Sequence, residues 1–189
     1  MKSNKSFFVL LVALAAVLTG AWLLYDNLGS QFNTAGLASQ ETTAETTATA
    51  AETAPNFTVT DLQGNPVQLQ DFFGKPILLN FWASWCGPCK SEMPDLEEAY
   101  RKYGNDIHFL IVNLTDGTRE TVASASDYIK QAGYSFPIYF DTTTEAAMTY
   151  QAYSIPVTFF IGADGAPIAY YTGAMSANIL QQGIDLLLP

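Results

Sequence analysis

A near-continuous apolar run, Ile77 to Ala83, leads within three residues into the tetrapeptide Cys86-Gly87-Pro88-Cys89. A run with no polar face is typical of a central strand that is covered on both sides. The segment that follows favours helix, because Pro88 stands at an early helical position and Met93, Leu96 and Tyr100 recur at helical spacing. The sequence therefore predicts a buried strand, a tight turn that holds two cysteines, and a helix over about 88–103.

The rest of the chain after residue 56 alternates strand and helix patterns. Strands are predicted over 57–60, 67–69, 107–114, 136–140, 157–161 and 168–171. Helices are predicted over 121–132, 145–152 and 178–188, with Ser176 as the N-cap of the last. Strands that alternate with helices, followed by a terminal hairpin and helix, imply an α/β sandwich with a mixed sheet.

The N-terminus carries a different signal. Lys2 and Lys5 precede 19 uncharged residues, Phe7 to Tyr25, about the length that a helix needs to cross a bilayer. The basic residues before this run and Asp26 after it favour an outside C-terminus. A cleaved secretory signal is the alternative, but the run is long and its end is bulky rather than small-x-small. A buried core helix fits poorly, because the run is apolar on every side. We expect residues 1–25 to be an uncleaved signal anchor that forms one transmembrane helix.

Within residues 26–55, the stretch from Thr42 to Ala54 is almost entirely Ala, Thr and Glu and lacks the large apolar side chains that build a core. We interpret them as a flexible linker, and residues 56–189 as one domain. The domain holds six Lys and Arg against fourteen Asp and Glu, a net charge of −8. This acidity makes nucleic acid a poor partner. Anionic lipid would also repel the acidic domain, so the anchor, rather than the domain surface, should hold the protein at the membrane.

Cys86 and Cys89 are the only cysteines of the chain. A cysteine at a helix N-terminus faces free backbone N–H groups and the positive end of the helix dipole, which favour the reactive thiolate. The second cysteine is one turn along the same side, where it can close a disulfide. A structural disulfide would constrain little in so short a loop. A zinc site would need two more ligands, and His108 is the only histidine. The pair is therefore predicted to be redox-active, with no metal and no bound organic cofactor.

The sequence Phe81-Trp82-Ala83-Ser84-Trp85-Cys86-Gly87-Pro88-Cys89-Lys90 resembles the active site of the thioredoxin superfamily. Three further motifs resemble its membrane-tethered TlpA/ResA-like branch: Gly74-Lys75-Pro76, Glu92-Met93-Pro94 and Thr172-Gly173-Ala174. The resemblance covers roughly residues 55–187. It implies a thioredoxin-like three-layer α/β/α sandwich with a mixed central sheet.

The resemblance also assigns roles to single residues. Ile155-Pro156 matches the cis-proline loop, which faces the disulfide and pairs with substrate backbone; on this match we favour a cis bond over an ordinary loop proline before a strand. Trp85, with Gly87 and Pro88, would line the substrate-binding surface and shield the pair. Thioredoxins carry a buried Asp where this chain has Asn80, so that proton carrier is missing. Glu92 matches a glutamate of the ResA-like branch and is the candidate acid–base group. The alternative is that its negative charge only stabilises the first turns of the helix.

We expect an extracytoplasmic, membrane-bound thiol–disulfide oxidoreductase that reduces protein disulfides, because the Gly87-Pro88 dipeptide is that of reducing thioredoxins. The resemblance implies a membrane electron donor of the CcdA or DsbD type, and apocytochrome c, with its CxxCH pair, as one substrate. A disulfide oxidase or isomerase of the same fold stays open. A peroxidase would need a lone cysteine in a Pro-x-x-x-Thr/Ser-x-x-Cys context. A Sco-like copper-handling protein would need CxxxC and a ligand His, for which only His108 is present.

Overall fold

The computed structural model describes Thr19, Ala38–Ser39 and residues 53–188. Residues 37–189 form one compact unit, and residues 1–36 form another, of which only Thr19 is described. Within the described residues, no helix is both long enough and apolar enough to span a bilayer. The predicted anchor, residues 1–25, lies outside the described residues except for Thr19, as does most of the predicted linker.

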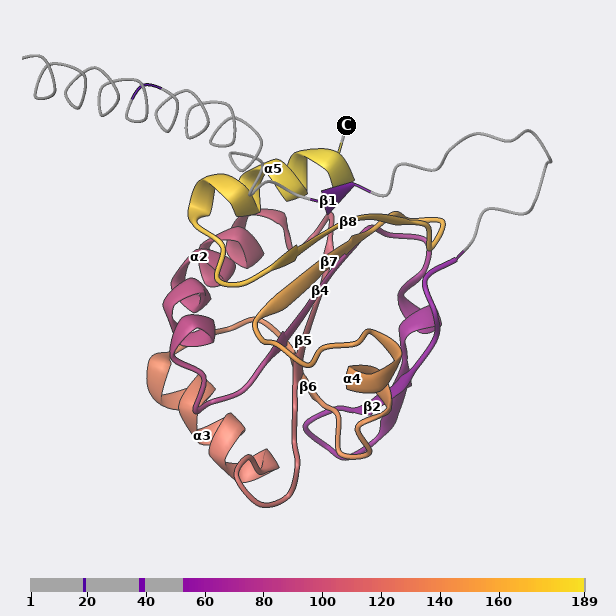
Figure 1. The fold of residues 1–189 in the computed structure, drawn as a ribbon. Helices are drawn as coiled ribbons and strands as arrows, with labels where there is room; N and C mark the ends of the chain where they lie inside the picture. The colour runs from indigo at the N-terminus through magenta and orange to yellow at the C-terminus, as the bar shows by residue number, and fades with distance from the viewer. Residues whose placement is uncertain (1–18, 20–37, 40–52, 189) are drawn as a thin grey trace, which may run out of the picture. The chain divides into compact units, whose positions relative to one another are not determined.

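One mixed sheet organises the domain, with the strand order β1-β8-β7-β4-β5-β6-β2-β3 (Figure 1). At its centre β4 (Ile77–Trp82) pairs in parallel with β5 (His108–Asn113), which pairs in parallel with β6 (Ile138–Phe140). On the other side of β4, the hairpin of β7 (Val157–Ile161) and β8 (Pro167–Thr172) runs antiparallel. The outer antiparallel strands are β1 (Ala38–Ser39), β2 (Thr58–Thr60) and β3 (Pro66–Gln68).

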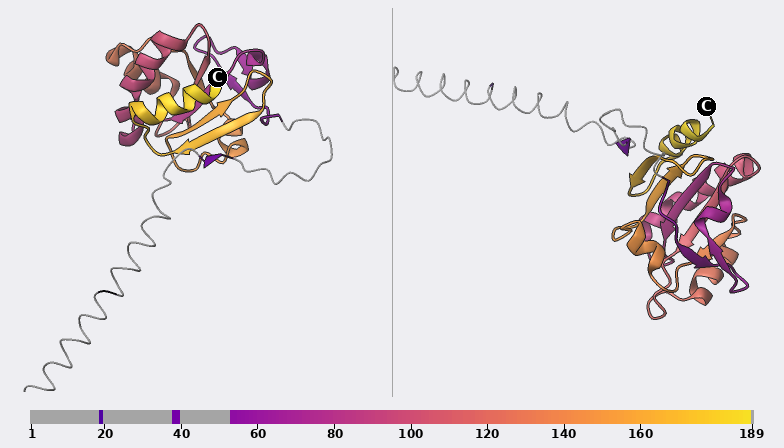
Figure 2. Two further views of the ribbon diagram at one scale, coloured as in Figure 1. Left: turned by 90° about the horizontal axis from the view of Figure 1, so that it is seen from above. Right: turned by 90° about the vertical axis from the view of Figure 1, so that its right-hand side faces the viewer.

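The two faces of β4 enter two separate cores, because side chains alternate along a strand. Leu78 and Trp82 pack in the first core, whereas Ile77, Leu79 and Phe81 pack in the second. The first core is covered by three helices, α2 (Gly87–Tyr103), α3 (Val122–Ala132) and α5 (Ala177–Leu187). The second is covered more thinly, by the short helix α4 (Glu145–Thr149) and the 3₁₀ turn η1 (Leu69–Phe72). Figure 2 shows α5 lying along the β7–β8 hairpin.

The helix α2 begins where the sequence predicts it, since Cys86 is its N-cap and Pro88 stands in its first turn. Ser176 is the N-cap of α5 as predicted, but its side chain makes no capping hydrogen bond. The chain turns sharply after α4, because Gln151 adopts a left-handed conformation with φ of 52°. The helix predicted over 145–152 therefore ends at Thr149.

Two other boundaries differ from the sequence prediction by two residues or more. The strand predicted from Phe136 begins only at Ile138, because the Ser135 N–H donates to the Glu97 carboxylate and Pro137 has no N–H to donate. The packed domain also begins before residue 56. Ala54 is buried and its N–H donates to the Gly165 carbonyl at 2.7 Å, and β1 lies within the segment predicted as linker. These contacts are invisible in an Ala- and Thr-rich sequence.

Candidate active site

Cys86 and Cys89 lie at the start of α2, just after β4, and their sulfurs form a disulfide. The Cys86 Sγ accepts the Cys89 N–H at 3.1 Å, and the Cys86 carbonyl accepts the Lys90 N–H at 3.1 Å. Both side chains are buried, Cys86 to 4% exposed and Cys89 completely. A thiolate on Cys86 would thus be held by the free N–H groups of the first helical turn. The predicted redox pair is present in its oxidised state.

The loop between α4 and β7 faces the disulfide. The Ile155–Pro156 peptide bond is cis, which confirms the sequence prediction. The Cys86 Sγ lies 3.7 Å from the Ile155 carbonyl oxygen, and the Pro156 carbonyl accepts the Gly173 N–H at 2.8 Å. The backbone of Ile155 therefore borders the reactive sulfur, in the position where a substrate strand could pair with it.

Glu92 lies one helical turn beyond Cys89 and is buried to 1% exposed. Its Oε1 accepts from the Asn80 amide at 2.9 Å, and its Oε2 accepts the Met175 N–H at 2.9 Å. Burial raises the pKa of Glu92 to about 7, against the lowering effect of these two hydrogen bonds. The carboxyl group can therefore take up and release a proton near neutral pH, one turn from the buried cysteine.

Asn80 stands on β4 and points toward α2, with the Leu78 and Trp82 face of the strand. Its amide nitrogen donates to Glu92 and also to the Thr158 hydroxyl, each at 2.9 Å, while its Oδ1 has no partner among the described residues. A protonated Glu92 has a hydroxyl to donate, and a rotated Asn80 amide would present an acceptor to it. Asn80 is thus a neutral, buried hydrogen-bond partner of Glu92.

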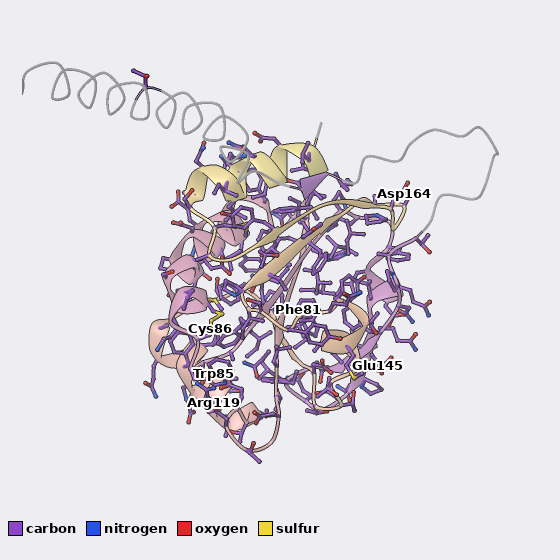
Figure 3. All side chains as sticks on the ribbon, in the orientation of Figure 1. Phe81, Trp85, Cys86, Arg119, Glu145 and Asp164 are labelled. Atoms are coloured by element: carbon purple, nitrogen blue, oxygen red, sulfur yellow. A yellow bond between two sulfur atoms is a disulfide. The ribbon has the colours of Figure 1, made fainter. Side chains whose placement is uncertain are left out.

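The predicted surface residues surround the pair. Gly87 and Pro88 are exposed, and the indole of Trp85 is 41% exposed. The guanidinium of Arg119 lies over the Trp85 ring, 3.6 Å from its centre. Figure 3 shows Cys86, Trp85 and Arg119 following one another along one side of the domain. The sequence indicated a role for Trp85 but gave no sign of its cationic neighbour.

A second buried carboxylate, Glu120, lies beside the cysteine turn. It is fully buried, and its Oε1 accepts from the Ser84 N–H at 2.9 Å and the Asn113 amide at 2.7 Å. Its Oε2 accepts from the Ser84 hydroxyl at 2.7 Å. Glu120 therefore ties the turn two residues before Cys86 to the end of β5. Sequence reasoning missed it, because a Glu between Arg119 and Thr121 looks like an ordinary exposed loop residue.

His108 lies at the opposite end of the sheet from the cysteines. It opens β5 and pairs with Ile77, the first residue of β4, whereas the cysteines follow the last. Five residue steps of strand separate the two ends, roughly 17 Å. Its ring packs on Phe72, and burial lowers its pKa. His108 therefore does not join the two sulfurs, and within the described residues no group of three His, Cys, Asp or Glu could hold a metal.

The model of the AhpC/TSA family matches residues 50–168. A thiol-disulfide oxidoreductase ResA of Bacillus cereus (strain ATCC 10987 / NRS 248) is 34% identical, and the match covers all of both chains. The ResA of Bacillus subtilis (strain 168) is 31% identical over 72% of this chain and 74% of its own length.

Solved structures give the same result. A putative thiol:disulfide interchange protein DsbE from Chlorobium tepidum aligns with a TM-score of 0.65 at 27% identity, over 76% of this chain and all of that one. StoA from Bacillus subtilis aligns with a TM-score of 0.60 at 26% identity, over 69% of this chain and 97% of that one. The fold, the Cys86–Cys89 disulfide and these similarities agree: the chain belongs to the thioredoxin-like AhpC/TSA family and is a ResA-like thiol-disulfide oxidoreductase.

Proposed function

We propose that this protein reduces disulfides of other proteins outside the cytoplasm, with Cys86 as nucleophile, Cys89 as resolving cysteine and Glu92 as acid–base group. The uncharged run at residues 7–25 would anchor it in the membrane, and the remaining chain would lie on the outer side. Trp85, Gly87, Pro88, Ile155 and Pro156 would form the surface that receives the substrate.

The reaction runs in two exchanges. The Cys86 thiolate attacks one sulfur of the substrate disulfide, so that a mixed disulfide forms and the first substrate thiolate leaves. Cys89 loses its proton and attacks the Cys86 sulfur, so that the second substrate thiolate leaves and the Cys86–Cys89 disulfide closes. Two electrons pass to the substrate, and two protons complete its thiols. The structure has the disulfide that remains at the end of this sequence.

Glu92 is the observation that carries the proposal. The Cys89 thiol is completely buried, so that its proton needs an acceptor inside the protein. Glu92 is the buried carboxyl on the same helix face, with a pKa raised to about 7 by burial. A base whose pKa lies near the working pH is the most effective proton carrier.

The oxidised domain needs a source of electrons outside the cytosol. A membrane protein of the CcdA or DsbD type, which carries electrons across the bilayer, fits this need. A CxxCH segment of apocytochrome c is the substrate that we propose first, since its disulfide must be reduced in the same compartment.

The variant Glu92→Gln tests this role, since it keeps the size of the side chain but cannot carry a proton. We expect its exchange rate with a peptide disulfide to fall by about 100-fold at pH 7, the lower end of the range for general acid–base catalysis. The pH profile of the rate should also lose its step near pH 7. Rates and thiol pKa values equal to those of the unmodified protein would remove Glu92 from the mechanism.

A further inference from the structure

The segment Leu114–Thr121, here called the arm, connects β5 with α3 and lies beside the active site. Its attachment point is Glu120, whose carboxylate holds both the N–H and the hydroxyl of Ser84. A second tie is the Leu114 N–H, which donates to the Trp82 carbonyl at 2.9 Å. The arm is therefore fastened at both of its ends to the last residues before Cys86.

Arg119 is the residue that the arm presents to solvent at this place. The Cζ atom of its guanidinium lies 3.6 Å from the centre of the Trp85 ring. This stacking fixes the direction of an otherwise flexible side chain. Within the described residues, the only ion pair joins Arg101 to Glu97, and no hydrogen bond involves the Arg119 side chain. Its planar set of N–H donors is thus free to receive an anion.

The acidic groups of the arm do not occupy Arg119. The Glu120 carboxylate turns inward to Ser84 and Asn113. The Asp116 Oδ1 accepts from the N–H groups of Thr118 and Glu120 and from the Thr118 hydroxyl, and so closes the turn of the arm itself. Among the residues that the structure describes, Arg119 therefore has no ionic partner, although the domain has a net charge of −8, and it lies next to the residue that precedes the nucleophile.

We propose that Arg119, stacked on Trp85, is a specificity-determining contact for protein substrates that carry an Asp or Glu beside their reactive cysteine. This inference rests on the proposed reductive exchange at Cys86. A carboxylate next to a disulfide raises the pKa of its cysteine thiol, which makes that sulfur a poorer leaving group. The guanidinium donates two N–H hydrogen bonds to the carboxylate and offsets its charge, while the indole packs beneath the pair. Glu120 acts as a positioning residue, because it fixes the arm that holds Arg119.

The test uses the full-length protein in detergent micelles and three peptide disulfides that differ in one residue before the reactive cysteine: Glu, Gln or Lys. Each rate is divided by the rate of the same peptide with dithiothreitol, which removes the intrinsic effect of the flanking charge on the disulfide. After this correction we expect kcat/KM for the Glu peptide to exceed that for the Gln peptide about two- to fivefold, as for an exposed ion pair. The Lys peptide should be the slowest.

Arg119→Gln should abolish the preference for Glu, so that its corrected rates with the Glu and Gln peptides become equal. Lys130→Gln, which removes an exposed charge at the far end of α3, is the matched control and should keep the preference. Equal corrected rates of the unmodified protein with the three peptides would overturn the inference, as would a preference that survives in Arg119→Gln. Because the Gln peptide reports the exchange reaction itself, its failure to react would instead refute the proposed function.

Discussion

Glu92→Gln should remove a pH-dependent part of the stability of the oxidised protein. The pKa of Glu92 is about 7 in the folded state and 4.5 as a free side chain, so the folded protein binds more protons between these values. Stability contributed by the neutral carboxyl is therefore fully present below pH 4.5 and is lost as the pH rises to about 7. The difference of 2.5 units corresponds to about 3 kcal/mol of unfolding free energy.

Other buried groups titrate as well, so the informative quantity is the difference between two proteins. Urea unfolding of the oxidised protein at pH 4, 6 and 8 gives the curve for each. From pH 4 to pH 8, the unfolding free energy of the variant should rise by about 3 kcal/mol relative to that of the unmodified protein. Gln fits the site, because its carbonyl can accept the Met175 N–H and its amide can donate to the Asn80 Oδ1 once the Asn80 amide has rotated; this oxygen has no partner among the described residues.

Glu98→Gln is the control, because it removes a carboxylate from the exposed side of the same helix. If Glu92→Gln and the unmodified protein lose stability in parallel from pH 4 to pH 8, the raised pKa of Glu92 is refuted, together with the acid–base role built on it.

Six further substitutions, at five positions, test other contacts. Cys89→Ser should leave a stable mixed disulfide between Cys86 and a peptide substrate, visible by mass spectrometry, whereas Cys86→Ser should trap none. Asn80→Asp would place the oxygens of two carboxylates about 2.9 Å apart. Between pH 5 and pH 8 the unfolding free energy of this variant, measured by urea unfolding, should therefore fall by roughly 3 kcal/mol more than that of the unmodified protein. Glu120→Ala leaves the buried Ser84 N–H and Asn113 amide without an acceptor and should lower the unfolding free energy by about 3 kcal/mol. Glu120→Gln should lower it less, since the Ser84 hydroxyl can accept a hydrogen bond from the Gln amide. Gly183→Ala should destabilise the protein by about 1–3 kcal/mol in the same assay, because the added Cβ would lie 2.1 Å from the Phe160 ring. This loss should outweigh the better helix propensity of Ala. Unchanged stability would show that α5 can shift away from β7.

The sequence predicted the parts of the fold that depend on local pattern. The apolar run Ile77–Trp82 became the central strand, and Pro88 and the spacing of Met93 and Leu96 placed the helix that follows. The chemistry of the cysteine pair could also be predicted, because it depends on neighbours within one helical turn. The cis bond before Pro156 and the candidate role of Glu92 were predicted only from resemblance, since nothing local distinguishes either residue.

The rest of the site depends on contacts between distant segments. Glu92 is bonded to Met175, 83 residues away, and Ser84 to Glu120, 36 residues away. No periodicity reveals that Glu120 turns inward while its neighbour Arg119 turns outward onto Trp85. Burial of a carboxylate is costly unless it is hydrogen-bonded, and only the folded arrangement of β4, β5 and the arm shows that Glu120 meets this condition.

The reduction potential of the Cys86–Cys89 pair at neutral pH is the most direct test of the proposed reductive role. It can be measured on residues 37–189, the compact unit, by equilibration with glutathione or dithiothreitol buffers. A value of about −250 mV or lower, near that of thioredoxin, is expected for a reductant supplied with electrons from the membrane. A value of about −120 mV, near that of DsbA, would show that the protein donates disulfides and would refute the reductive role.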